Sequence, residues 1–455
     1  MAHFIFGNKP ETILRKSARG NAGKTNHVLM GSILEVKDVS GDWFKVDSLG
    51  KGKSGWVNKN DVRDDPILKI FFVDVGQGDG AIIESPEGIM LVDGGPNSNF
   101  YKFMKHRYKR LLKAGEQVVI KAMVVSHPDY DHFNGLTAIL KDKRFTVKNI
   151  YHNGIIRYDA DNLPPDRNFD LGKMKPKTIS GETKQVITET FDTLDQIENI
   201  IPDGHLMTSF RKFWQAALDA RRDGRLVGAK RVTNRNETLP GYSRDDDDKL
   251  FVSVLGPVPT KQSGRVEYVG FPDAHDVAKT DPDISSSHTR NGHSIVLKLK
   301  YGDHTVLLGG DLNIPAQQHL MQYYGDDNPF RVDVAKACHH GSSDFHVDFL
   351  KKTLPQANVF SSGDNKSFDH PMADAVGAIG RHTRGSHPLL FSTELARAVS
   401  STKTHFGLIN LRSNGKTLVM AQMKEQHSKA DIWDSFTVPW PGKFAKEIKA
   451  SEAQT

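Results

Sequence analysis

The chain has 455 residues, of which 37% are hydrophobic and 25% are charged, with a formal net charge of +6. At roughly 150 residues per domain this length predicts about three domains, and the composition excludes fibrous, collagen-like and wholly disordered chains. No run approaches about 18 apolar residues, so no membrane span is expected, and the single cysteine, Cys338, excludes an intramolecular disulfide. The N-terminus lacks the pattern of a secretory signal, which predicts a cytoplasmic location.

The first 62 residues are expected to form a small all-β domain. Short apolar runs at residues 32–36 and 43–46 flank a polar turn, and a third run follows at residues 55–57. The glycine turn, the Trp-Phe-Lys-Val run and the Gly-Trp-Val run resemble bacterial SH3-like domains. This resemblance implies an SH3-like domain over residues 1–62, with a protein or peptide as its partner.

Beyond Pro66 the chain changes to continuous apolar runs bounded by glycine. Runs of this kind are typical of strands that are buried on both faces of a sheet. Helical patterns lie between them, so the expected fold of residues 67–425 is α/β, with two sheets covered by helices in an αββα sandwich. The predicted strands are residues 67–75, 81–83, 89–92, 122–125, 250–255, 294–299, 305–308, 332–337, 406–411 and 417–423, and the predicted helices are residues 101–112, 136–140, 316–324 and 347–354.

Residues 155–249 are more polar than the segments on either side and are predicted to be an insertion. Within them, residues 210–227 have a helical pattern that carries Arg221, Arg222 and Arg225. This helix is either a solvated element packed through its apolar side, or a basic surface over the functional site that steers a polyanionic substrate. Residues 426–455 are predicted to be a C-terminal extension.

The clearest functional signal is the segment Ser-His-Pro-Asp-Tyr-Asp-His at residues 126–132, which follows an apolar run. In a tight loop, His127 and Asp129 can face one cation while Asp131 and His132 face another. Paired cations about 3.5–4 Å apart hold a substrate oxygen and generate hydroxide near neutral pH. The pattern therefore predicts a metal centre.

Three other predicted strands also end in Asp or His. Asp93 stands before two glycines, Asp311 follows two glycines, and His339 and His340 follow a third apolar run. One such residue is ordinarily a capping or core residue, but four strand ends that each deliver a metal ligand predict a shared site.

Six motifs in order resemble the metallo-β-lactamase superfamily, and within it the branch found in the ComEC competence protein. They are Phe-Val-Asp-Val-Gly-Gln-Gly-Asp at 72–79, Asp-Gly-Gly at 93–95, Ser-His-Pro-Asp-Tyr-Asp-His at 126–132, Ser-Ile-Val-Leu at 294–297, Gly-Asp at 310–311 and His-His-Gly-Ser at 339–342. The resemblance covers residues 68–425 apart from the insertion. It implies an αββα metal-dependent hydrolase.

The resemblance also implies which residues hold the cofactors, two divalent cations that are either Zn²⁺ or Mn²⁺. Asp311 would bridge the two cations, and Asp131 would also take part in catalysis. His293 is a candidate for the ligand that the first position otherwise lacks, and without such a ligand that position would be weak or filled by water. Asp129 stands where the superfamily more often has histidine, and an added oxygen ligand favours Mn²⁺ as a competitor of Zn²⁺. The implied metal ligands are His127, Asp129, Asp131, His132, Asp311 and His339.

Five further residues have implied roles around the metals. Asp93 would support the site from the end of its strand. Asp74 and Asp79 would shape a loop at the rim, although Asp79 could instead hold a turn. His340 or His370 would protonate the leaving group, although His340 could instead bond the backbone.

These residues predict a hydrolase in which a metal-bound hydroxide attacks phosphorus or a carbonyl carbon. The ComEC-like resemblance favours phosphodiester bonds, with nucleic acid or a cyclic nucleotide as the substrate. One alternative is an ester or thioester hydrolase on the same core, because a fold does not fix its substrate. The other is a metal-stabilised scaffold without catalysis that the SH3-like domain recruits to a partner.

Overall fold

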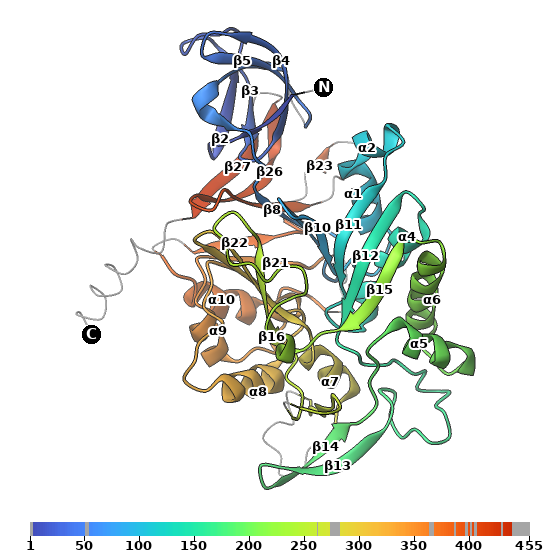
Figure 1. The fold of residues 1–455 in the computed structure, drawn as a ribbon. Coiled ribbons are helices and arrows are strands. Elements are labelled where there is room, and N and C mark those ends of the chain that lie inside the picture. Colours follow the sequence, from blue (N-terminus) through green and yellow to red (C-terminus); the bar gives the residue numbers. More distant parts are fainter. Residues whose placement is uncertain are drawn as a thin grey trace, which may run out of the picture.

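The computed structural model describes residues 3–50, 54–261, 263–273, 283–363, 368–385, 388–395, 399–400, 403–404, 407–428 and 431–438. Two β-sheets lie face to face between two layers of helices, and an all-β region stands at one end (Figure 1). The structure therefore confirms the predicted fold class.

The first sheet has nine strands in the order β15-β12-β11-β10-β9-β8-β25-β26-β27. Its strand β8 is buried along its whole length, because helices cover one face of the sheet and the second sheet covers the other. Strands β10, β11, β12 and β15 run parallel, so their C-terminal ends meet at one edge. The strands are β8 (Leu68–Val73), β9 (Ala81–Ser85), β10 (Gly88–Val92), β11 (Val118–Val124), β12 (Phe145–His152), β15 (Leu226–Arg231), β25 (Leu408–Ser413), β26 (Leu418–Ser428) and β27 (Asp431–Val438).

The second sheet has six strands in the order β16-β18-β19-β20-β21-β22. Strands β19 to β22 are parallel neighbours, so they too end at a common edge. The core between the two sheets includes Phe72 and Ile83 from the first and Leu297 and Val306 from the second. The strands are β16 (Phe251–Gly256), β18 (Val296–Tyr301), β19 (His304–Leu308), β20 (Val334–Lys336), β21 (Ala357–Phe360) and β22 (Leu389–Ser392).

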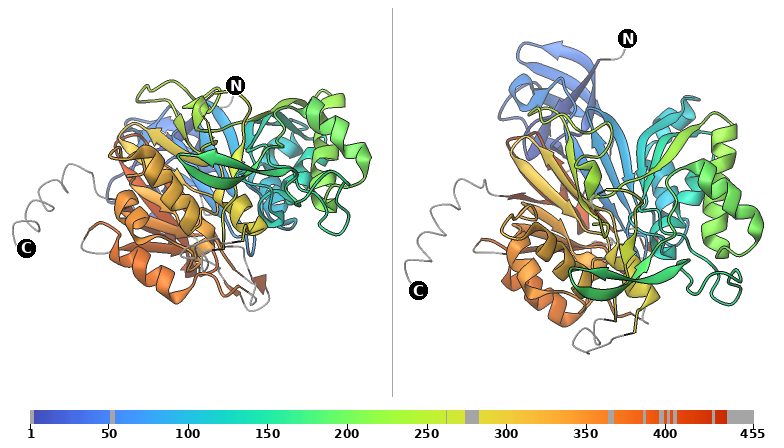
Figure 2. Two further views of the ribbon diagram at one scale, coloured as in Figure 1. Left: turned by 90° about the horizontal axis from the view of Figure 1, so that it is seen from below. Right: turned by 60° about the horizontal axis from the view of Figure 1, so that its bottom comes forward.

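Helices cover the outer face of each sheet (Figure 2). Helices α1, α4 and α6 pack on the nine-stranded sheet, and α8, α9 and α10 pack on the six-stranded sheet. Across the described ranges, no helix has the length and apolar character needed to span a membrane. The helices are α1 (Asn99–Arg107), α2 (Lys109–Lys113), α3 (Tyr130–Phe133), α4 (Leu136–Lys141), α5 (Leu194–Ile200), α6 (Thr208–Arg222), α7 (Ser286–Gly292), α8 (Ile314–Tyr324), α9 (Val347–Thr353) and α10 (Ala373–Arg381).

The N-terminal region is one antiparallel sheet in the order β3-β2-β6-β5-β4-β1-β7. It lies against the edge strand β27, where the Trp433 backbone N–H donates to His27 Nε2 (3.4 Å) and Ser435 Oγ donates to Glu11 Oε1 (2.7 Å). The region therefore contacts the main body directly. Its strands are β1 (Phe4–Gly7), β2 (Glu11–Arg15), β3 (Lys24–Leu29), β4 (Ile33–Ser40), β5 (Trp43–Ser48), β6 (Gly55–Asn58) and β7 (Val62–Arg63).

The range predicted as an insertion, residues 155–249, is built into the main body. Its strand β15 joins the nine-stranded sheet, and its helix α6 covers that sheet. The predicted helix 210–227 ends at Arg222, because Gly224 adopts a positive φ of 71° and the chain then enters β15. The same range adds the hairpin β13 (Met174–Ile179) and β14 (Glu182–Ile187), which pairs with β17 (Tyr268–Val269).

At the other end, β26 and β27 extend the nine-stranded sheet to Val438, past the boundary predicted at residue 425. The sheet continues because β27 pairs along most of β26 and buries Ile432 and Val438. Residues 439–455 of the predicted C-terminal extension lie outside the described residues.

Candidate metal centre

The predicted metal-binding residues come together where parallel strands of both sheets end. Asp93 directly follows β10, and the loop at residues 126–132 follows β11 and includes α3. From the second sheet, Asp311 follows β19 and His340 follows β20. Side chains more than 200 positions apart in the sequence thus share one edge of the sandwich.

Four of these side chains surround one point, called here the second position. The Nε2 atoms of His132 and His340 lie 3.2 Å and 3.0 Å from Asp311 Oδ2. His340 Nε2 also lies 3.5 Å from Asp131 Oδ2, and His132 Nε2 lies 4.0 Å from Asp131 Oδ1. His132, His340 and Asp311 are buried, which places the point away from bulk water.

Hydrogen bonds orient both histidines toward this point. His132 Nδ1 donates to Asp93 Oδ2 (2.9 Å), and His340 Nδ1 donates to the Ser361 carbonyl oxygen (2.9 Å) and lies 3.3 Å from Asp79 Oδ1. When Nδ1 carries the proton, the lone pair is on Nε2. Metal-binding histidines commonly have a carboxylate or carbonyl partner of this kind.

The donor set fits a divalent cation. His340 Nε2 makes no hydrogen bond of good geometry within the described part of the chain, although it is buried. Asp131, His132 and His340 offer ligand atoms within 4.8 Å of one another, and so do Asp79, Asp311 and His340. Two imidazole nitrogens and two carboxylates suit Zn²⁺ as well as Mn²⁺.

The electrostatics of the cluster keep its carboxylates charged. Burial raises the pKa of Asp311, but His132, His340 and Lys336 outweigh burial and hold that pKa well below its usual range. For His132 the direction is opposite: burial by itself lowers the pKa. The carboxylates of Asp311 and Asp93 outweigh burial and raise the pKa of His132 well above 6.5. A cation entering the site would take over the role of the protons on the histidines.

Lys336 supplies a buried cation that the sequence analysis missed. It is the last residue of β20, and its Nζ lies 2.5 Å from Asp79 Oδ2 and 3.4 Å from Asp311 Oδ1. Nζ also donates to the Gly310 carbonyl oxygen (3.0 Å). Asp79 is thus an ion-pair partner of Lys336. The Lys336 ammonium group lies beside Asp311 Oδ1, whereas His132 and His340 lie beside Asp311 Oδ2.

His127 and Asp129 form what is called here the first position. His127 Nδ1 lies 3.0 Å from Ser126 Oγ, a hydroxyl that donates to Asp93 Oδ2 (2.6 Å). His127 Nε2 lies 3.8 Å from Asp129 Oδ2. Burial, followed by the neighbouring charge of His132, lowers the pKa of His127 to about 4.

Asp129 is held by two arginines that the sequence analysis did not single out. Arg157 Nη1 donates to Asp129 Oδ1 (2.6 Å), and Arg290 Nε, from α7, donates to the same oxygen (2.5 Å). Burial raises the pKa of Asp129, but Arg290, His127 and Arg157 together lower it below its usual range. The carboxylate is therefore ionised and engaged in the absence of a metal.

Two other histidines proposed as metal ligands from the sequence lie outside the second position. His339 faces Asn291, with 3.3 Å between His339 Nε2 and the amide, and belongs to no group of candidate ligands among the described residues. His293 donates through Nε2 to the Val269 carbonyl oxygen (2.7 Å) and stacks on Tyr268, so it does not supply the missing first-position ligand. The structure thus brings His340, rather than His339, to Asp131 and Asp311.

His370 and Asp74 border the cluster. The His370 ring centroid lies 6.1 Å from that of His340, and Gln77 Nε2 donates to His370 Nδ1 (2.9 Å). Asp74 instead shapes its loop, because its Oδ1 accepts from the Gly76 N–H (3.0 Å) and its Oδ2 accepts from the Gly407 N–H (3.3 Å). Asp74 therefore supports the rim through the backbone.

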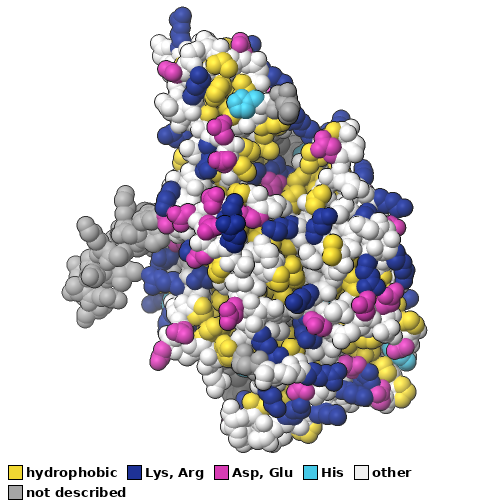
Figure 3. Space-filling model, viewed as in Figure 1, with side chains coloured by type: hydrophobic (Ala, Val, Ile, Leu, Met, Phe, Trp, Pro, Cys, Tyr) yellow, Lys and Arg dark blue, Asp and Glu magenta, His cyan; other side chains and the backbone are white. Residues whose placement is uncertain are grey.

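The three arginines of the steering alternative, Arg221, Arg222 and Arg225, have other partners in the structure, and burial of Arg225 corrects the prediction for that residue. Arg221 pairs with Asp195 and Glu198 (2.6 Å each), and Arg222 also pairs with Glu198 (3.0 Å). Figure 3 shows basic and acidic side chains interspersed on this side of the molecule. The third arginine is buried and donates to backbone carbonyls: Arg225 Nη1 bonds Leu140 O (2.8 Å) and Phe145 O (3.3 Å).

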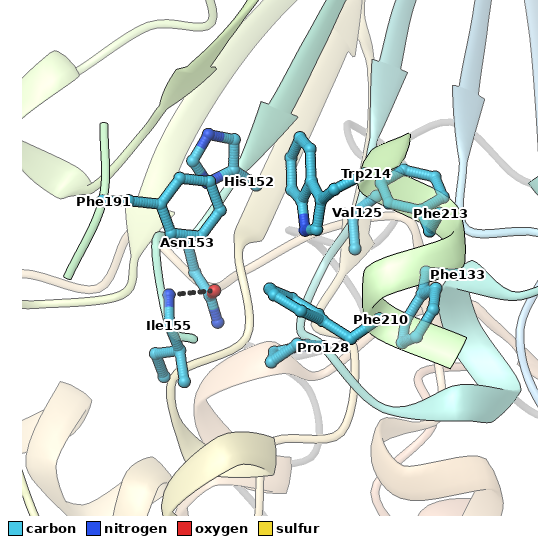
Figure 4. A pocket seen from close by; sticks show the side chains of 10 residues that line it. All are labelled: Val125, Pro128, Phe133, His152, Asn153, Ile155, Phe191, Phe210, Phe213 and Trp214. Atoms are coloured by element: carbon cyan, nitrogen blue, oxygen red, sulfur yellow. Dashed lines mark hydrogen bonds between the residues drawn. The ribbon is translucent and has the colours of Figure 1, made fainter. Parts of the chain in front are cut away.

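An aromatic cluster supports the metal loop from the side of α6 (Figure 4). His152, at the end of β12, stacks on Phe191 with 4.3 Å between ring centroids and meets Trp214 edge to face at 5.1 Å. Pro128 of the metal loop (residues 126–132) and the adjacent Phe133 line the same small pocket. Burial lowers the pKa of His152 to about 3, so its ring is neutral at pH 7.

This buried histidine should make the metal-free protein sensitive to acid. In the unfolded chain His152 has a pKa of about 6.5, so unfolding takes up a proton between pH 6.5 and 3 and stability falls as pH drops through that window. The free energy of unfolding should lose up to about 1.4 kcal/mol per pH unit from this group.

Replacing His152 with Phe should flatten that slope, as measured by urea denaturation at several pH values between 6.5 and 4. His106→Phe changes an exposed histidine on α1 and is the matched control. Equal slopes in the wild type and His152→Phe would show that His152 is not the group responsible.

In a comparison with known proteins, one family model matches the part of the chain that contains the metal loop. Residues 73–205 match the family model of the Metallo-beta-lactamase superfamily. No curated protein sequence matches the chain.

Solved structures with weak similarity include CmlA, a diiron beta-hydroxylase from Streptomyces venezuelae, at 12% identity and a TM-score of 0.34 over 74% of this chain. A long form RNase Z from yeast aligns at 8% identity and a TM-score of 0.33 over 71% of this chain. The chain aligns with 55% and 40% of the lengths of those two proteins. Because the TM-scores are low, these two structures carry no argument about activity. The family match and the site geometry together identify residues 73–205 as a metallo-β-lactamase superfamily domain.

Proposed function

We propose that the protein is a metal-dependent hydrolase of phosphodiester bonds, in the ComEC-like branch of the metallo-β-lactamase superfamily. The observation that carries the proposal is the second position, where two oriented histidine Nε2 atoms and two carboxylates face one point. The cation would be Zn²⁺ or Mn²⁺, because this mixed set of nitrogen and oxygen ligands suits either.

Asp131, His132, Asp311 and His340 would hold the cation. When bound, a divalent cation polarises a substrate oxygen and lowers the pKa of water. Asp93 keeps the Nε2 lone pair of His132 directed at the site. On the substrate side, we assign His370 to donate a hydrogen bond to the leaving group.

The environment of His370 supports that assignment. Gln77 Nε2 donates to His370 Nδ1, so in the neutral ring the proton is on Nε2. The His370 ring lies beside the ligand histidine His340, 6.1 Å between centroids. The Nε2–H group of the neutral ring can therefore donate a hydrogen bond to a leaving-group oxygen next to the metal centre.

Phosphodiesters are favoured over carboxylic esters by the six motifs that resemble the ComEC-like branch. In particular, the second of the four ligand residues in the loop at residues 127–132 is an aspartate, Asp129, as it is in that branch. The substrate would then be nucleic acid or a cyclic nucleotide. The N-terminal all-β region, which we propose to be SH3-like, would bind a protein or peptide partner.

A panel assay tests this function. Protein loaded with Mn²⁺ or Zn²⁺ is expected to hydrolyse bis(p-nitrophenyl) phosphate, single-stranded DNA or RNA, or cyclic dinucleotides, and to lose that activity in Asp131→Ala. The matched control is Asp203→Ala, which removes an exposed carboxylate far from the cluster in sequence. Hydrolysis of p-nitrophenyl acetate alone would instead favour an ester or thioester hydrolase. Bound metal without turnover of any substrate would favour the scaffold.

A further inference from the structure

The two metal positions differ in the number of ligands that they own. The second position has four of its own, as described above. Among the described residues, the candidate ligand group that contains His127 also consists of His132 and Asp311, which are ligands of the second position. One imidazole nitrogen binds one cation at a time, so the first position is left with His127, a share of Asp311, and Asp129.

The Asp129 carboxylate already accepts hydrogen bonds from three donors. Its Oδ1 accepts from Arg157 Nη1 (2.6 Å) and Arg290 Nε (2.5 Å). With the Asn291 amide oriented so that its oxygen accepts from His339 Nε2, the amide nitrogen donates to Asp129 Oδ2 (3.0 Å). Both oxygens of the carboxylate are therefore in use.

The arginines are fixed in place rather than free to swing away. The Arg157 and Arg290 side chains are only 13% and 11% exposed. Arg157 Nη1 also reaches the Pro128 carbonyl oxygen (3.3 Å), and Arg290 Nη1 lies 3.4 Å from Asp170 Oδ2. The two guanidinium groups balance the carboxylates of Asp129 and Asp170, so this cluster offers a cation little net attraction.

Lys336 weakens the first position from the other side. A bridging carboxylate needs one oxygen for each cation, and Asp311 Oδ2 already faces His132 and His340. Its Oδ1 lies 3.4 Å from Lys336 Nζ, which is buried and anchored 2.5 Å from Asp79 Oδ2. The ammonium group therefore stands beside the oxygen that a second cation would need.

We propose that this chain holds one divalent cation, at the second position, and that the Asp129–Arg157–Arg290 cluster and Lys336 take the place of a second cation. The donor set of the first position does not fit a metal, in contrast to the pair of cations that the sequence motifs imply. This inference rests on the proposed function only in that both require a metal at the second position.

The test is the metal content of the full chain. Metal-free protein is incubated with excess Mn²⁺ or Zn²⁺, desalted and analysed for bound metal, and the Mn²⁺ form is also examined by electron paramagnetic resonance. We expect about one equivalent per chain and the spectrum of an isolated Mn²⁺ ion. Two equivalents, or the spectrum of a spin-coupled Mn²⁺ pair, would overturn the inference.

Matched variants separate the two positions. Asp129→Asn should keep one equivalent of metal, whereas Asp131→Asn should lose it, since Asp131 is a ligand of the second position and Asp129 is not a ligand. Loss of metal in Asp129→Asn would overturn the inference.

Turnover of bis(p-nitrophenyl) phosphate, measured on the same samples, keeps the two proposals apart. One equivalent of metal without turnover contradicts the proposed function and leaves the inference standing. Two equivalents with turnover contradict the inference and leave the function standing.

Discussion

Replacing His340 with alanine should abolish metal binding and turnover, whereas His339→Ala should keep its metal. The reason is that His340 Nε2 lies 3.0 Å from Asp311 Oδ2 and 3.5 Å from Asp131 Oδ2, while His339 faces Asn291. A metal supplies several kcal/mol of transition-state stabilisation. At about 1.4 kcal/mol for each factor of ten, turnover should fall by about 10³-fold or more.

Bound metal in the two purified variants, measured by elemental analysis, is the direct test, and hydrolysis rates follow it. His106→Ala changes an exposed histidine and controls for loss of any histidine. If His339→Ala loses its metal while His340→Ala retains it, the ligand is His339, as the motif resemblance implies, and the geometry has been misread.

Replacing Lys336 with methionine should lower the free energy of unfolding of the metal-free protein by about 3–5 kcal/mol. The substitution leaves Asp79 and Asp311 buried without their cation, and breaking a buried ion pair from one side has a cost of this size. Excess metal should restore part of the loss, because a cation at Asp311 replaces some of the missing positive charge.

Urea denaturation of metal-free and metal-loaded protein measures both effects. Lys351→Met is the control, since Lys351 is exposed and its ion pair with Asp348 is screened by solvent. The double variant Lys336→Met with Asp79→Asn should lose less free energy of unfolding than the sum of the losses in the two single variants. A loss below about 1 kcal/mol in Lys336→Met would mean that Lys336 is not a strong partner of the two carboxylates.

The parts of the site that the sequence predicted share a local signature. The loop at residues 126–132 concentrates four candidate ligands, two His and two Asp, directly after an apolar strand, and Asp93 and Asp311 each lie at a strand end beside glycine. Parallel strands of one sheet end at a common edge, so their C-terminal residues meet without any knowledge of the tertiary contacts. The αββα layering followed from the same apolar runs.

Other features depend on long-range contacts that no local pattern encodes. The choice between His339 and His340 rests on two consecutive residues with positive φ, 48° and 56°, which turn the two rings in different directions. Arg157 and Arg290 lie 133 positions apart in the sequence and meet only through Asp129. Lys336 did leave a signal, because a lysine in the apolar run at residues 332–337 must have a buried partner.

The basic helix shows how composition can mislead. Seen as a sequence, α6 carries a cluster of arginines, but its acidic partners Asp195 and Glu198 come from the preceding helix α5. The Arg225 guanidinium group donates hydrogen bonds to backbone carbonyl groups of the main body. A positive charge counted along the chain is therefore no measure of positive charge at the surface.

The pairing of β8 with β25 has a consequence for how the protein is made. Residues 68–73 lie in the middle of the nine-stranded sheet, yet their neighbour on one side is residues 408–413, and the Asp74 N–H donates to the Gly407 carbonyl oxygen. During translation the strand β8 leaves the ribosome long before its partner exists. At about 5–20 residues per second, the roughly 200 residues between His132 and His340 alone take about 10–40 s to synthesise. A nascent chain thus carries Asp131 and His132 as a half-built site for that time, with one edge of β8 unpaired although β9 already pairs with the other edge. The finished metal centre can assemble only near the end of synthesis.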